Sequence, residues 1–121
     1  MVEVEVAQQP GGYVLVRFSG EIDMSEGVPV RQAFAQALAA GRSAVLIDLC
    51  EVRFLAVVGT DWVDAAVDEL TRRGRAVAVV CAAGGPVRRI VGLLGLDERW
   101  PLHHDLAQAA AAVAGGRTDD R

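Results

Sequence analysis

The sequence of 121 residues contains no lysine and no asparagine, so all 12 of its basic residues are arginine. Its formal net charge is −4, and adjacent arginines occur only as two pairs, at positions 72–73 and 88–89. A protein that binds nucleic acid through the phosphates normally presents a basic patch or stripe. The sequence therefore predicts no nucleic-acid partner.

Long apolar runs are also missing from the sequence. No apolar stretch approaches the roughly 18 residues that indicate a transmembrane helix. The residues from Met1 to Glu5 alternate valine with glutamate and do not form the basic and apolar regions of a signal peptide. We therefore expect a cytoplasmic protein with no membrane partner.

Cysteine and histidine are scarce. Cys50 and Cys81 both lie inside apolar runs, which is typical of buried thiols in a reducing compartment. Both fall near the ends of strands expected to be neighbours, so redox control by this pair stays open, although adjacent parallel strands seldom give disulfide geometry. His103 and His104 are adjacent and would face opposite sides of a strand, so no metal site is predicted.

No catalytic motif is recognisable. Gly84 and Gly85 precede a proline and have neither the spacing nor the lysine of a phosphate-binding loop. The sequence also contains no nucleophile elbow and no histidine-based triad. We predict no enzymatic activity and no cofactor.

Hydrophobic residues make up 52% of the chain, which is enough for the core of one domain of this length. Strand patterns occur at residues 2–6, 13–19, 43–50 and 76–82, with a short edge strand at 101–103. Helix patterns occur from the cap Ser25 to Gly41 and at 60–73, 86–95 and, after the cap Asp105, 106–114. This order predicts an α/β domain with a mixed four- to five-stranded sheet and about four helices. The domain is expected over residues 1–114, with a flexible polar tail at 115–121.

Four segments carry a family resemblance. They are VRFSGEID at 16–23, VLIDL at 45–49, VRFL at 52–55 with Gly59, and PVRRIVGLLGLD at 86–97. In this order and spacing they resemble the STAS domain of bacterial anti-sigma factor antagonists, over residues 2–113. The resemblance implies a STAS-like (SpoIIAA-like) fold and a surface that binds an anti-sigma factor, itself a serine kinase-like protein.

The resemblance also implies a switch that this sequence does not match. In that family an Asp-Ser-Ser/Thr-Gly motif opens the second helix, and the partner kinase phosphorylates a hydroxyl there. The added negative charge and bulk weaken docking. The matching residues here are Ala56, Val57, Val58 and Gly59, so Val57 and Val58 stand at lost phosphoacceptor positions. Only Gly59 matches, and we expect it to permit a backbone turn.

The partner-binding surface is expected to have the segment from Phe54 to Gly59 at its centre. Its predicted members are Asp23, Ala56, Val57, Val58, Gly59, Thr60 and Trp62. Thr60 is either a displaced phosphoacceptor or the N-cap of the second helix. Trp62 is either an interface anchor or a side chain packed against a neighbouring loop. Asp23 borders the surface or caps the first helix. Asp48 is either a functional carboxylate or, as we expect, a buried acid that accepts hydrogen bonds from neighbouring loop amides.

The function predicted from these residues is that of an antagonist which binds an anti-sigma factor and releases a sigma factor, without phosphorylation at the usual site. Two alternatives stay open: a scaffold module of a sensory assembly, and a sensor that holds a nucleotide or lipid in a groove near Val57. The oligomeric state does not follow from the sequence.

Overall fold

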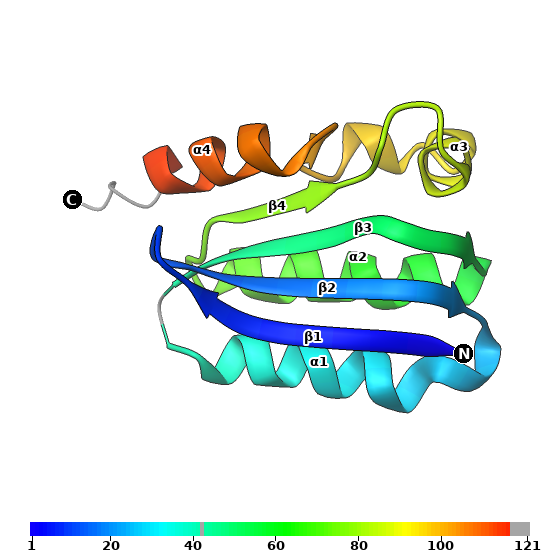
Figure 1. The fold of residues 1–121 in the computed structure, drawn as a ribbon, viewed down its shortest axis with the longest axis horizontal. Coiled ribbons are helices and arrows are strands. Elements are labelled where there is room, and N and C mark those ends of the chain that lie inside the picture. Colours follow the sequence, from blue (N-terminus) through cyan, green and yellow to red (C-terminus); the bar gives the residue numbers. More distant parts are fainter. Residues whose placement is uncertain (42, 117–121) are drawn as a thin grey trace.

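The computed structural model describes residues 1–41 and 43–116. They form one sheet with strand order β1-β2-β3-β4-β5, in which β1 runs antiparallel to β2 and all other neighbours are parallel (Figure 1). The elements are β1 (Val2–Gln9), β2 (Tyr13–Ile22), η1 (Met24–Glu26), α1 (Gly27–Ala39), β3 (Ala44–Leu55), α2 (Val57–Arg72), β4 (Val77–Val80), α3 (Pro86–Leu93), η2 (Leu96–Glu98), β5 (Leu102–His103) and α4 (Leu106–Gly116). The mixed sheet and its helices confirm the predicted α/β class.

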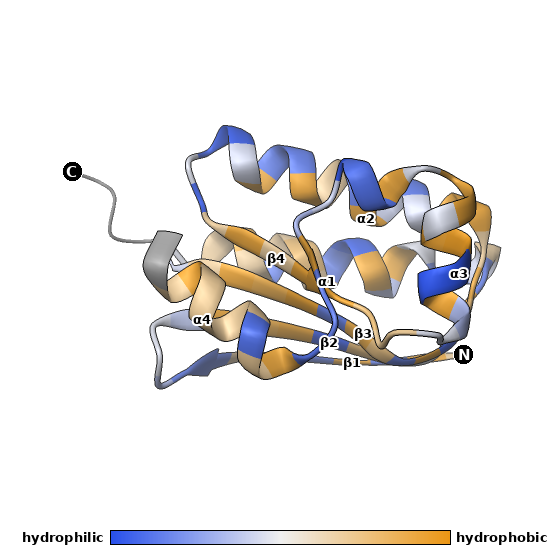
Figure 2. Cartoon of the chain, turned by 90° about the horizontal axis from the view of Figure 1, so that it is seen from above, coloured by the Kyte–Doolittle hydropathy of each residue, from blue (hydrophilic) through white to orange (hydrophobic). Residues whose placement is uncertain are grey.

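The helices cover the two faces of the sheet unequally. One large core packs side chains of α1, α2 and α3 against the central strands, around Phe18 and Ile47. A smaller core on the other face joins Ala109 and Val113 of α4 to Leu46 and its neighbours. Figure 2 shows hydrophobic residues concentrated on β3 and β4, whereas hydrophobic and hydrophilic residues alternate along α1 and α2. This alternation is expected of helices that bury one stripe.

The third strand is longer than the sequence pattern predicts. It continues past Cys50 to Leu55 because its backbone stays paired with β2, with Gly20 opposite Val52 and Ile22 opposite Leu55. Its side chains there alternate irregularly because the pairing shifts after Arg17 and again after Gly20. A register shift of this kind breaks the period of two that identifies a strand in a sequence.

The ends of three helices also differ from the predictions. Asp23, not Ser25, caps the first helical turn, because its Oδ1 accepts hydrogen bonds from the amide and hydroxyl of Ser25 at 2.9 and 2.6 Å. The second helix begins at Val57, three residues before the predicted start at Thr60. The cap at Asp105 is confirmed by its hydrogen bond from the Gln108 amide, and α4 continues to Gly116. The rest of the predicted tail, residues 117–121, lies outside the described residues.

A buried arginine caps the C-terminal end of the first helix. Arg75 is 7% exposed and donates hydrogen bonds to the carbonyls of Ala37, Leu38 and Ser43 at 3.1, 3.2 and 2.5 Å. Two of these carbonyls belong to the last turn of α1, whose final carbonyl groups have no partner within the helix. Burial lowers the pKa of Arg75. Within the described ranges, no helix is long and apolar enough to cross a membrane.

Candidate functional site

The C-terminal ends of β2 and β3 meet at one edge of the sheet. Ile22 pairs with Leu55, and the Ala56 amide donates a hydrogen bond to the Ile22 carbonyl at 2.9 Å. Four large apolar side chains on the adjoining segments are exposed: Met24 (78%), Val28 (59%), Phe54 (51%) and Val57 (57%). We call these four residues the apolar edge. Exposed apolar side chains gathered at one place on a small domain are typical of an interaction surface.

The predicted docking segment is a strand end joined almost directly to a helix. Ala56 is the single residue between β3 and α2, and its extended backbone (φ −67°, ψ 157°) turns the chain into the helix without a side-chain cap. Val57 is exposed and Val58 half-buried, so both are accessible from solvent. The two positions that lack a hydroxyl are therefore the accessible ones.

Gly59 is needed for a reason other than the predicted turn. It lies inside α2 and is not among the glycines with positive φ in the part of the chain described here. A Cβ atom at this position would approach Leu55 Cδ1 to 2.7 Å and Ile22 Cγ2 to 3.0 Å. The glycine therefore allows the first turn of α2 to pack directly on the ends of the two strands.

Thr60 is not the N-cap of α2, because Ala56 holds that position. Its side chain lies within the first turns of the helix, is 2% exposed, and donates a hydrogen bond from Oγ1 to the Val57 carbonyl at 2.5 Å. This contact is typical of threonine inside a helix. In this conformation the hydroxyl is accessible neither to a partner nor to a kinase.

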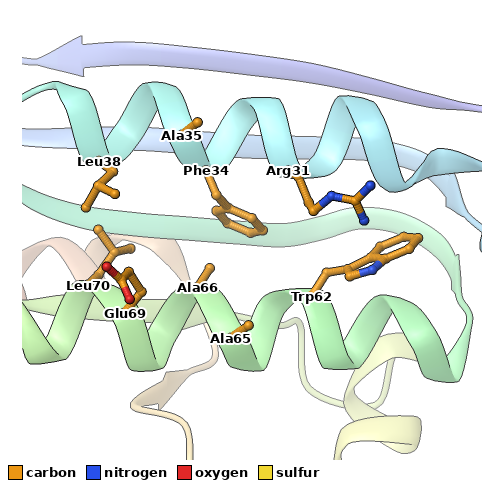
Figure 3. Close-up of a pocket in the computed structure, with 9 residues that line it drawn as sticks. All are labelled: Arg31, Phe34, Ala35, Leu38, Trp62, Ala65, Ala66, Glu69 and Leu70. Carbon is orange, nitrogen blue, oxygen red and sulfur yellow. The ribbon is translucent and has the colours of Figure 1, made fainter.

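Trp62 packs against the first helix and not against a loop. Its ring lies where a Cβ on Gly27 would come within 3.0 Å, and the guanidinium of Arg31 lies 5.8 Å from the ring centroid. Trp62 and Arg31 stand at one end of a groove of about 300 Å³ between α1 and α2 (Figure 3). Val57 is not part of its lining, so this groove is not the ligand groove that was predicted near Val57.

Asp48 is a buried structural acid, as predicted. Its carboxylate accepts hydrogen bonds from the Arg17 Nε and the Cys50 amide, both at 2.9 Å. Arg17 also lies 3.8 Å from Glu5, and the Asp48 hydrogen bond raises the pKa of its guanidinium. The Arg17 contact links β2 to β3, whereas the Cys50 amide belongs to the same strand as Asp48, so neither partner is one of the predicted loop amides.

Both cysteines are free thiols, with Cys50 exposed and Cys81 buried. Loss of water around the sulfur and a hydrogen bond with Asp48 raise the pKa of Cys50 to about 12. Burial likewise raises the pKa of Cys81 to about 12. Because the thiolate is the reactive form, neither residue is activated for redox chemistry at neutral pH. In the described ranges no group of three or more His, Cys, Asp and Glu side chains is arranged to hold a metal ion.

Two residues of the apolar edge, Met24 and Val28, were missing from the predicted surface, whereas Phe54 and Val57 belong to the predicted segment. The available signal was the presence of large apolar residues just after one predicted strand, at positions off the buried stripe of the first helix. It could not be used without knowing which strand ends meet.

Comparison with known proteins identifies the family. The STAS domain model matches residues 3–109. The chain is 34% identical over 119 residues to the anti-sigma-F factor antagonist RsfB of Mycobacterium tuberculosis, covering 98% of this chain and 94% of that protein. The crystal structure of an anti-sigma factor antagonist from Mycobacterium paratuberculosis has a TM-score of 0.82 at 33% identity, covering 93% of this chain and 94% of that one.

A more distant structure agrees in fold. The phosphorylated form of SpoIIAA from Bacillus has a TM-score of 0.67 at 16% identity, covering 91% of this chain and 97% of that one. The resemblance inferred from the sequence motifs is thereby confirmed. The chain belongs to the STAS domain family.

Proposed function

We propose that this protein is an anti-sigma factor antagonist, which binds a serine kinase-like anti-sigma factor through the apolar edge and so releases a sigma factor. Relatives that match nearly the whole chain are named as antagonists of this kind. The observation that carries the proposal is Val57, a large apolar side chain 57% exposed at the first position of α2. Burying it with its three neighbours against a partner would supply the apolar centre that interfaces require.

The proposed antagonist is not switched off by phosphate at the start of α2. Val57 and Val58 have no hydroxyl, and the nearest one, on Thr60, is buried and already hydrogen-bonded within the helix. A valine pair also makes the start of α2 more apolar than two serines would. The complex should therefore persist when the partner is supplied with ATP.

A charge placed at the centre of the apolar edge tests this function. We expect Val57→Asp to weaken binding of the anti-sigma factor by roughly tenfold or more, because a carboxylate would have to be desolvated in the interface. Calorimetric titration against a purified kinase-like anti-sigma factor measures the change, with circular dichroism to establish that the variant is folded.

Ala107→Asp is the matched control for that titration. Ala107 is exposed in the first turn of α4, on the other face of the sheet, where an acid suits the helix dipole. The affinity of the Ala107→Asp variant for the anti-sigma factor should equal that of the unaltered protein. Equal affinities for both variants would show that the partner binds elsewhere, and no binding by the unaltered protein would refute the function.

A further inference from the structure

The groove between α1 and α2 has no part in the docking proposed above, and none of the four residues of the apolar edge lines it. Its volume of about 300 Å³ is at the lower end of the range for small-molecule sites. At about 30 Å³ for each atom of the size of a water molecule, it has room for about ten non-hydrogen atoms. The groove is therefore large enough for a small organic ligand.

The walls of the groove are almost entirely apolar. Its floor consists of the buried side chains of Phe34, Ala66 and Leu70. Two small residues, Ala35 and Ala65, lie on its exposed rims and leave it open to solvent. Water in such a groove has few polar partners, so an apolar chain or ring would replace it favourably.

The two ends of the groove differ in charge. Figure 3 shows Arg31 and Trp62 facing each other at one end, with Leu38, Glu69 and Leu70 at the other. Glu69 is already paired with Arg72 of α2 and with Arg73, the residue that caps this helix. Arg31 has no ion pair among residues 1–41 and 43–116. The groove thus offers one cation without an acidic partner, at one end only.

We propose that this groove binds a small amphipathic carboxylate, with its head group on Arg31 and its aliphatic chain directed toward Leu38 and Leu70. A guanidinium matches a carboxylate with two parallel N–H donors, and stacking on an indole leaves these in-plane donors available. The Trp62 ring, 5.8 Å from the Arg31 guanidinium, is placed to hold it in that orientation. A cationic or doubly charged ligand does not fit, because the rest of the lining supplies no unpaired acid and no second base.

Titration with octanoate, which has the predicted size, tests the binding and its chemistry. We expect saturable binding of one molecule per chain, followed by nuclear magnetic resonance shifts of the groove residues. Each methylene removed should weaken binding roughly fourfold, so hexanoate should bind roughly fifteenfold more weakly. Octylammonium should not bind. The absence of saturable octanoate binding, or equal binding of octylammonium, would overturn the proposal.

Variants on the groove separate its charged end from its apolar walls. Arg31→Ala should weaken the binding of octanoate by about tenfold or more while leaving the binding of octanol unchanged, because only the charged contact is lost. Ala65→Leu fills the groove from an exposed rim position, keeps a good helix former, and should abolish binding of both ligands. Arg89→Ala removes an exposed arginine from α3, outside the groove, and should change neither affinity. Similar losses in the two arginine variants would indicate unspecific attraction and reject the site.

Discussion

At the scale of single residues, Gly59 shows how a residue without a side chain helps to position the apolar edge. Its backbone is ordinary helix, so conformational freedom is not what the position requires. What it requires is space, because Ile22 is 0% and Leu55 5% exposed, and neither can swing away into solvent. The absence of a Cβ at Gly59 therefore allows the first turn of α2, which carries Val57, to lie close against the ends of β2 and β3.

Replacing Gly59 with alanine should therefore destabilise the protein. Alanine gains about 1 kcal/mol in helix propensity, but forcing a methyl group into a packed core costs about 1–3 kcal/mol. With contacts of 2.7 and 3.0 Å, we expect a net loss of about 1 kcal/mol in the free energy of unfolding. Urea denaturation measures it.

Gly92→Ala is the matched control in α3. Its Cβ would meet only Arg88 Nη1, at 3.6 Å, which is ordinary van der Waals contact, so the propensity gain should dominate and the variant should be as stable as the unaltered protein or more so. Equal shifts of the same sign in the two variants would contradict the packing explanation of Gly59.

At the scale of secondary-structure elements, Arg75 links the end of α1 to the start of β3 from the connection that follows α2. Its three acceptors, on Ala37, Leu38 and Ser43, are backbone carbonyls, and the Ala37 carbonyl also accepts a hydrogen bond from the Ala40 amide. A helix end of this kind normally ends with a glycine cap and solvent contact. Here a side chain distant in sequence performs that task, so α1 and α2 are fastened together at the end opposite to the docking surface.

Arg75→Met keeps much of the side-chain volume and removes all the donors. A buried carbonyl without a partner costs about 1–3 kcal/mol, so we expect a loss of roughly 2–3 kcal/mol in the free energy of unfolding. Arg72→Met is the control, because Arg72 is an exposed arginine whose ion pairs with Asp68 and Glu69 lie at the surface and contribute little to stability. Equal losses in both variants would mean that the carbonyl contacts of Arg75 do not stabilise the fold.

At the scale of the whole molecule, the sequence predicted the strands and helices whose hydrophobic residues repeat with the period of a strand or a helix. Four strands and the helices between them follow from apolar runs and turn residues. The sequence did not predict the features that depend on contacts between segments distant along the chain. The end of β3 looks like a loop because a register shift disturbs its alternation, and α2 starts early because Ala56 gives no capping signal. The groove and the role of Arg75 arise only once α1 and α2 lie side by side.

The most consequential prediction for the whole molecule is that the start of α2 is not phosphorylated by a kinase-like anti-sigma factor. Incubation with such a protein and ATP should leave the intact mass of the unaltered protein unchanged. The hydroxyl in the first turns of α2 belongs to Thr60, which is 2% exposed and donates a hydrogen bond to the Val57 carbonyl. A kinase needs an accessible hydroxyl that can reach its ATP.

The variant Val57→Ser/Val58→Ser restores hydroxyls at the accessible positions and is the informative comparison. It should gain one phosphate and then lose affinity for the partner, because the phosphate adds charge and bulk at an interface built from apolar side chains. Thr60→Val distinguishes the remaining possibility. If the unaltered protein gained a phosphate and Thr60→Val did not, α2 would have to open to expose that hydroxyl, and the account of a lost switch would be wrong.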